Sequence, residues 1–391
     1  MSDRVRTYAV AFAALMFLPL GAVASQGETA LLLLAAVPLL AWTALRGGIA
    51  ALGRLPVAWV LAALIVWAAV TAPLAVVPAD ALHLALSLAV LFATALVAWG
   101  AARPDASGAA IVLRAAVAGY VLGCILLAVE ILGDLPIANF ARGTKPGDEH
   151  LELTVLNPGL TVLTLMVWPL AARLWPSSRI AALAAVLAAF ALVALGESVT
   201  ARVALVAGGA AFALAWWGGR RAVVAVTLAA MVAVLVAPLV AGSIAPERFG
   251  SALAEERSSI LHRLYIWDFA AARIAEKPLL GWGLDASRSI PGGDVPVFKG
   301  GPALSLHPHD VALQAWLELG LPGGLALAAV IALVGIGIAK LPARPRMPAA
   351  AVLATALSFG AASYGLWQNW WLASLGLAAV LARALTPADE P

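Results

Sequence analysis

The segment 306–324 combines two histidines with two acids and an amide in a spacing that suits chemistry. Gln314 and Glu318 lie four residues apart, so they share one face of a helix. A glutamate that faces lipid is costly, and we therefore expect this face to be a buried polar lining. His309 lies at the start of the same helix, next to Asp310. A lone histidine at a helix start is usually structural, but its polar company favours a functional role here.

A metal centre is not predicted from these histidines. His307 and His309 are two residues apart, which is not the spacing of a shared helical metal site, and no acidic triad lies nearby. Cys124 is the only cysteine, which excludes a disulfide within the chain and any multi-cysteine metal site. We expect no metal and no cofactor, with His307 as a supporting residue.

Arg202 lies just inside an apolar block, where inserting an arginine costs about 2.5–3.5 kcal/mol. Ser198 and Thr200 suit a helix start, whose free N–H groups attract anions. A guanidinium at this place can hold a phosphate through two parallel hydrogen bonds. The structural alternative is an arginine that reaches to the membrane interface or pairs with Glu197.

A third group of candidates lies in 262–288, where Arg263 and Trp267 are four residues apart and share a helix face. Arginine beside tryptophan suits a ligand that combines phosphate with sugar. On this segment alone, a charged helix lying on the membrane is the favoured interpretation. Arg288 and, in a separate segment, Arg142 are weaker candidates for phosphate contacts.

The composition predicts an integral membrane protein. Hydrophobic residues make up 63% of the 391 residues and charged residues only 12%, against roughly 25% charged residues in a soluble domain. The apolar residues come in blocks of about 20, the length that crosses a hydrocarbon core of about 30 Å as a helix. The blocks lack strict alternation, which argues against barrel strands.

Twelve spans are predicted for an all-α, polytopic fold that forms a single membrane domain over residues 1–391. The tenth span looks long, and Gly320 and Pro322 can break it. The spans are 8–24, 29–45, 56–72, 81–99, 111–132, 158–172, 180–195, 200–217, 222–241, 311–339, 348–364 and 367–383.

Basic residues then set the orientation. With the N-terminus in the cytoplasm, the short cytoplasmic connections receive arginine and lysine, and the short outer connections receive neither. Short loops follow this positive-inside bias best. The sequence thus predicts that both termini lie in the cytoplasm.

Two longer outer segments, 133–157 and 242–306, are expected to be periplasmic. They hold nearly all of the remaining basic residues, which concentrates polar chemistry on one face. The second segment contains 257–277, a predicted amphipathic helix whose apolar stripe can lie on the membrane interface. Near the last outer connection, Trp367, Trp370 and Trp371 are interpreted as an interfacial aromatic belt.

These motifs resemble those of the O-antigen ligases and the related O-antigen polymerases and O-oligosaccharyltransferases. The ligase signature has His, then Asn, Ser or Gln, nine residues, Gly, two residues, and Gly, Thr or Tyr. Here it runs from His309 and Asp310 through nine residues to Gly320 and then Gly323. Asp310 departs from the pattern, and an acid there can change the basicity of His309. Further similar stretches are 197–202, Arg263-x-x-x-Trp267 and 278–283.

The resemblance implies a metal-independent, inverting glycosyl transfer on the periplasmic side. The donor would be a glycan on undecaprenyl diphosphate, and the acceptor the lipid A–core or another glycan. His309 would be the general base that removes the acceptor hydroxyl proton. Arg202 and Arg263 would hold the diphosphate, with Arg288 and Arg142 as weaker contacts. The expected partners also include membrane lipids but no nucleic acid.

Other functions stay open at this point. A polymerase that extends a lipid-linked polysaccharide is the main alternative within the family. A transporter of a lipid-linked oligosaccharide would also need a basic outer cavity, but it should show polar residues along a path through the membrane. The predicted spans carry almost no charge in their middles, which favours chemistry at one face. A structural subunit would leave the outer arginines unexplained.

Overall fold

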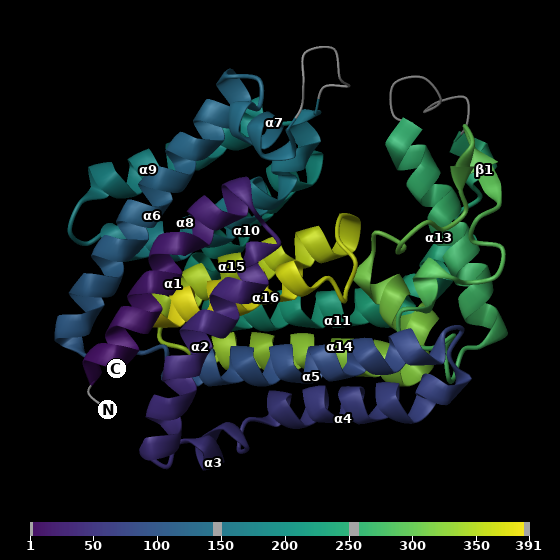
Figure 1. Ribbon diagram of the computed structural model, residues 1–391, viewed down its shortest axis with the longest axis horizontal. Coiled ribbons are helices and arrows are strands. Elements are labelled where there is room, and N and C mark those ends of the chain that lie inside the picture. Colours follow the sequence, from purple (N-terminus) through teal and green to yellow (C-terminus); the bar gives the residue numbers. More distant parts are fainter. Residues whose placement is uncertain (1–2, 144–150, 250–257, 387–391) are drawn as a thin grey trace.

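The structure is a computed structural model that describes residues 3–143, 151–249 and 258–386. It is an all-α bundle, as predicted, with one two-stranded hairpin (Figure 1). The helices are α1 (Asp3–Val23), α2 (Gly27–Leu45), α3 (Ile49–Leu52), α4 (Pro56–Thr71), α5 (Pro78–Ala101), α6 (Ala106–Leu132), α7 (Pro136–Arg142), α8 (Asn157–Leu174), α9 (Arg179–Leu195), α10 (Val199–Trp217), α11 (Gly219–Ser243), α13 (Ser258–Glu276), α14 (Val311–Ala339), α15 (Ala343–Ala362) and α16 (Asn369–Ala384).

Each of the twelve predicted spans coincides with one of these helices. Nine helices of the described chain are long and apolar enough to cross a membrane. The other three at predicted positions are α9, α15 and α16. Two of them are short, with 17 residues in α9 and 16 in α16, and α15 carries two arginines in its first turn. A polytopic membrane protein is confirmed, and the number of spans stays a prediction.

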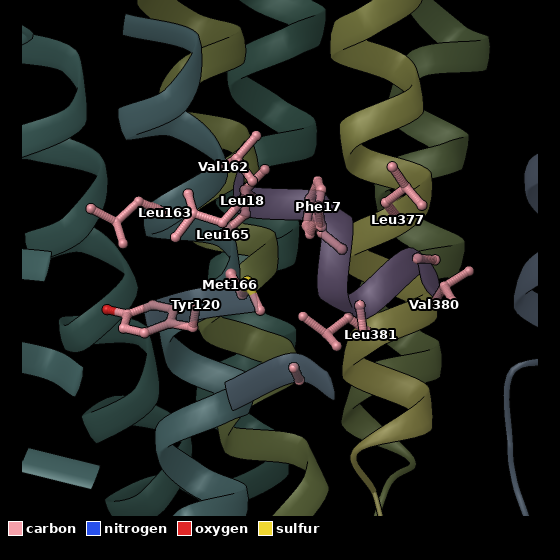
Figure 2. Packing of buried hydrophobic residues seen from close by; sticks show 14 of the residues in the cluster. Phe17, Leu18, Tyr120, Val162, Leu163, Leu165, Met166, Leu377, Val380 and Leu381 are labelled. Atoms are coloured by element: carbon pink, nitrogen blue, oxygen red, sulfur yellow. The ribbon is translucent and has the colours of Figure 1, made fainter. Parts of the chain in front are cut away.

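Helix α8 forms the centre of the bundle. Its residues 159–170 are buried without interruption, as expected for a helix that is apolar on all sides. Helix α1 lies between α8 and α16, and Figure 2 shows the side chains that fill both contacts. These are Phe17 and Leu18 of α1, Val162, Leu165 and Met166 of α8, and Leu377, Val380 and Leu381 of α16.

The predicted amphipathic helix is α13, and part of its apolar side packs inside the protein. Ile266, Ala271 and Ile274 are buried against α11 and α14. Next to α13 stands the hairpin of β1 (Pro296–Phe298) and β2 (Gly301–Pro302), which are antiparallel. Of the predicted stripe, Leu261 and Ala271 are buried and Trp267 is partly buried, so neighbouring helices cover part of it, and a position at the membrane interface stays a prediction.

The prediction that three tryptophans form an interfacial aromatic belt was wrong. Trp367, Trp370 and Trp371 are only 6%, 6% and 2% exposed. Trp370 packs edge-on to Tyr364, with ring centroids 4.7 Å apart. Trp371 packs edge-on to Phe359 at 6.0 Å. Aromatic pairs of this geometry stabilise a core beyond their buried area, so this cluster holds the end of α15 to the start of α16.

Candidate functional site

Helix α14 is broken at Gly320, whose backbone is non-helical at φ 63° and ψ −154°. The break was predicted from the glycines and proline of this segment. A break leaves helix carbonyls without their N–H partners, and such groups must be satisfied elsewhere. Three carbonyls before the break receive other donors. They are Leu317 O from Trp282 N at 2.9 Å, Glu318 O from Gly283 N at 2.8 Å, and Leu319 O from Trp67 Nε1 at 3.0 Å.

The backbone of the segment 278–283 therefore packs directly against the backbone of the broken helix. Leu321 N also donates to Pro278 O at 2.8 Å. A Cβ on Gly281 would collide with the Glu318 carbonyl, and a Cβ on Gly320 with that of Leu279. Both glycines also have positive φ, which other residues adopt at a cost. The two motifs that resemble the family thus form one structural unit.

The Glu318 side chain fixes the next part of the same loop. It is fully buried, and its carboxylate accepts four hydrogen bonds from three different segments. The donors are Gln314 Nε2 at 3.0 Å, Asp285 N at 2.7 Å, the Ser287 hydroxyl and Trp367 Nε1 at 2.7 Å. Gln314 in turn accepts from Leu366 N at 2.7 Å. The expected buried polar lining is confirmed, and its donors leave this carboxylate well satisfied.

His309 is held with one ring nitrogen available. Its Nδ1 lies 2.8 Å from the carbonyl oxygen of Ser363. A carbonyl only accepts hydrogen bonds, so Nδ1 carries the proton of the neutral ring and Nε2 keeps its lone pair. Burial lowers the pKa of His309 from its ordinary 6.5, and nearby Arg263 adds to this. His309 is therefore a neutral imidazole near pH 7 with a basic nitrogen, the form that a general base requires.

His307 holds the backbone of His309. That backbone has φ 58°, a strained value for a residue other than glycine. The N–H of His309 donates to Nδ1 of His307 at 3.1 Å, and the two rings meet edge-on with centroids 4.4 Å apart. Burial and the nearby cations lower the pKa of His307 to about 3. His307 is thus a neutral acceptor near pH 7, and it fixes the turn.

An arginine binds the C-terminus of α15, close to His309. Arg263 of α13 donates through NH1 to Ala362 O at 2.7 Å, one residue before the carbonyl that holds His309. Burial lowers the pKa of Arg263, but a guanidinium stays charged near neutral pH. Free carbonyls at a helix C-terminus attract cations. This helix end therefore holds the guanidinium and also favours a protonated His309.

Trp267 and Asp310 hold the backbone on either side of His309. Trp267 Nε1 donates to Pro308 O at 2.9 Å, which ties α13 to the turn that carries His309. Asp310 is the N-cap of α14, where its carboxylate accepts from Leu313 N at 2.8 Å. Asn and Ser, which the family pattern has at this position, are also strong N-caps. The departure at Asp310 thus conserves the cap, and its carboxylate points to the helix backbone.

A cavity of about 320 Å³ opens beside His307. Its lining brings together residues from distant parts of the chain, including Gln26, Asp285, Arg288, His307 and Trp367. His309 is not among the lining residues, but its ring lies against that of His307. The base and the cavity are therefore neighbours, separated by one side chain.

Arg202 takes a different place from the one expected. Its NH2 donates to the carbonyls of Gly196 at 2.6 Å and Ala194 at 3.2 Å, so it caps the end of α9. It does not line the cavity. Two residues further along α10, Ala204 O accepts from Thr355 Oγ1 of α15 at 3.3 Å. Thr355 is seven residues, about 10 Å, before the end of α15, so Arg202 lies at the same end of the bundle as Arg263.

The two weaker candidates are also separated. Arg288 lines the cavity and pairs with Asp285 at 2.9 Å. Arg142 is exposed in the last turn of α7 and does not line the cavity. The structure thus brings together His307, His309, Arg263 and Trp267, with Arg288 across the cavity.

Several partners of these residues were missed in the sequence. The carbonyls of Ala362 and Ser363 carry no side-chain signal, and only the three-dimensional structure places them beside His309. The amides Gln26, Gln368 and Asn369 also line the cavity. Their one signal in the sequence is their place in short outer connections.

The comparisons with known proteins cover this same region. Residues 183–328 match the O-antigen ligase family. A Rickettsia conorii protein described as a candidate polysaccharide ligase is 36% identical over 137 residues, which are 34% of this chain and 33% of its own length. A Rickettsia typhi protein with the same description is 28% identical over 255 residues, or 63% of this chain and 62% of its own.

The chain therefore spans about a third to three fifths of the length of these curated relatives. The family match includes Arg202, α13, the loop 278–288 and the break in α14. Apart from Arg202, these elements form part of the site around His309, whose other part is the end of α15. The resemblance drawn from the motifs is confirmed, because residues 183–328 match the O-antigen ligase family and the relatives are described as polysaccharide ligases.

Proposed function

We propose that this protein transfers a glycan from undecaprenyl diphosphate to an acceptor hydroxyl, with the lipid A–core as the acceptor, on the periplasmic face of a bacterial inner membrane. The family match and the described relatives support the general function of a glycan ligase or transferase. The observation that carries the finer proposal is the tautomer of His309. Its Nδ1–H is engaged by Ser363 O at 2.8 Å, so Nε2 is left as a base.

In this mechanism, Nε2 of His309 takes the proton of the acceptor hydroxyl as its oxygen attacks the anomeric carbon. The bond between that carbon and the phosphate oxygen breaks on the opposite side, which inverts the configuration. The diphosphate leaves with the bonding electron pair. Arg263 stabilises its growing charge, because a fixed cation in a water-poor site acts strongly on a developing anion. Arg202 and Arg288 are further candidates for the same diphosphate.

The test is transfer from purified undecaprenyl-diphosphate glycan to lipid A–core by the reconstituted protein. We expect the wild type to form the product and His309→Ala to be slower by at least about 100-fold, the usual contribution of a general base. His83→Ala is the matched control, because His83 is exposed on α5, and it should retain activity. An unchanged rate in His309→Ala would contradict the role of this residue.

The products also separate the alternatives. A ladder of longer lipid-linked glycans would replace the ligase with a polymerase of the same superfamily. If no product forms with a range of donors and labelled lipid-linked glycan crosses the membrane of proteoliposomes, a transporter takes its place.

A further inference from the structure

The cavity beside His307 has a lining that suits a sugar better than a diphosphate. Resting on the proposed function, we propose that it is the subsite for an uncharged pyranose ring next to the reacting bond. In this role, the amides of Gln26, Gln368 and Asn369 bind the sugar hydroxyls. All three side chains line the cavity, and none of them belongs to the matched residues 183–328.

Spare hydrogen-bonding capacity distinguishes these amides from Gln314, the fourth in the lining. Gln314 uses its nitrogen on Glu318 and its oxygen on Leu366 N. By contrast, Gln26 makes no capping bond to α2, and the Gln368 amide makes one long contact of 3.4 Å with the ring of His307. A primary amide offers both donors and acceptors. Such groups suit hydroxyls, which donate and accept as well.

The charges of the lining exclude an anionic ring. Asp285 and Arg288 are its charged residues, and they pair with each other at 2.9 Å. The His307 ring is neutral, as its lowered pKa requires. A uronate or a phosphate would therefore enter without a net positive charge to offset its desolvation. Arg263, which has no such carboxylate partner in the described chain, is the better contact for the diphosphate.

Two tryptophans give the cavity fixed apolar surfaces. The indole of Trp367 is anchored on Glu318 at 2.7 Å, and Trp370 packs edge-on to Tyr364. Ligand sites generally combine such apolar surfaces with a few placed polar groups. A volume of about 320 Å³ is at the small end of the range of roughly 300–1,000 Å³ for ligand pockets. The cavity therefore suits one or two sugar rings and no longer chain.

The position of the cavity relates it to the reaction. His307 is in its wall, and the ring of His309 lies against His307 with centroids 4.4 Å apart. The His307 side chain would thus separate the edge of a pyranose in the cavity from the base, His309. The amides would then decide which sugar is accepted, because a polar group left unpaired in a bound complex costs affinity.

Direct binding tests this subsite without relying on transfer. Full-length protein in nanodiscs is mixed with methyl pyranosides of glucose, galactose, mannose and N-acetylglucosamine, and with methyl glucuronide as the charged probe. Saturation-transfer NMR reports contact with the protein. We expect at least one neutral pyranoside to bind and the glucuronide not to bind.

The variants are Gln368→Ala and Asn369→Ala, with Asn139→Ala as the matched control. Asn139 lies on α7, and its side-chain amide donates to Asp134 O at 3.0 Å. The double variant of Gln368 and Asn369 should bind the pyranoside about tenfold more weakly, as expected for the loss of two hydrogen bonds, and Asn139→Ala should bind like the wild type. Gel filtration checks that each variant is folded.

Each outcome is decisive. Binding of the glucuronide as strongly as a neutral pyranoside overturns the argument from charge. No binding of any pyranoside, or equal binding by the double variant, overturns the subsite. His309→Ala should still bind the sugar. If binding is found without any transfer, the subsite stands and the proposed function fails. If the double variant transfers glycan as well as the wild type, the function stands and the subsite fails.

Discussion

At the scale of single residues, His307 acts through the backbone of His309. Its Nδ1 accepts the N–H of the residue two positions later, at 3.1 Å. An asparagine makes the same bond from its side-chain oxygen. We therefore expect His307→Phe to lower kcat by about tenfold or more with little change in KM, whereas His307→Asn retains most of the activity.

Steady-state kinetics of the two variants at saturating and limiting acceptor separate kcat from KM. A merely space-filling role for His307 predicts the opposite order, because phenylalanine is closer to histidine in size. Equal activity of both variants would show that the strained turn at His309 does not need this hydrogen bond.

Asp310 combines a helix cap with an unfavourable charge. Burial raises its pKa from 3.8 to about 6, although its bond from Leu313 N acts the other way. Because the folded pKa is raised, the associated stability is complete below about pH 4 and is lost as the pH rises through about 6. Asparagine keeps the cap and does not ionise.

We therefore expect Asp310→Asn to raise the melting temperature at about pH 7.5 and to change it little at about pH 4. Thermal unfolding in detergent at both pH values measures this difference. Asp310→Ala is the control, since it also does not ionise but loses the cap, and it should be less stable than Asp310→Asn by about 1 kcal/mol at either pH. An effect of Asp310→Asn that is the same at both pH values would contradict the titration.

At the scale of elements, the broken helix α14 depends on one glycine. Gly320→Ala would place a Cβ against the Leu279 carbonyl on a backbone with φ 63°. We expect it to release the loop 278–288 and to lower both stability, by more than about 1 kcal/mol, and transfer. Gly337→Ala on the same helix is the matched control, because a Cβ there meets nothing within 4 Å and alanine favours a helix.

Hydrogen exchange of the loop distinguishes the two variants. Faster exchange of the Trp282 and Gly283 amides in Gly320→Ala, and unchanged exchange in Gly337→Ala, is the expected result. If the loop stays protected in Gly320→Ala, these two amides do not depend on the break.

The sequence predicted the break in α14, but it did not predict which groups bind the carbonyls that the break frees. Glycine and proline at 320–324 are visible as local interruptions of an apolar helix. That the freed carbonyls bind Trp282 and Gly283 depends on a contact between segments about 35 residues apart, which no local pattern contains. The same limit explains Arg202, which was correctly placed near a helix start but whose guanidinium binds the carbonyls at the end of α9.

At the scale of the whole molecule, hydropathy located the twelve helices that were predicted as spans. It did not show which of these helices pack against one another. Every apolar block needs the same length to cross a bilayer, so length cannot tell that α8 is central. Likewise, Trp371 has the composition of a belt residue, but it is 2% exposed because the aromatic cluster covers it. Lipid and protein interior are both apolar, and the sequence alone distinguishes them poorly.

The short connections at the two ends of the bundle differ in their basic residues, and this difference predicts its orientation. Figure 1 places the N- and C-terminal ends together, on the side opposite α13 and β1. Near the termini, Arg6 and Arg46 stack on the ring of Trp42 at 4.7 and 5.1 Å. Arginines in short connections favour the cytoplasmic side. The end with α13 and His309 should then face the periplasm.

Cysteine labelling tests this orientation in a Cys124→Ala background, which has no other cysteine. Phe140→Cys on α7 is a suitable outer probe, since Phe140 is 87% exposed. Arg221→Cys, at an exposed position at the start of α11, is the matched inner probe. A membrane-impermeant maleimide should label Phe140→Cys in intact spheroplasts and Arg221→Cys only after the membrane is disrupted. The reverse pattern would place His309 in the cytoplasm, where a periplasmic acceptor could not reach it, and would thereby refute the proposed transfer.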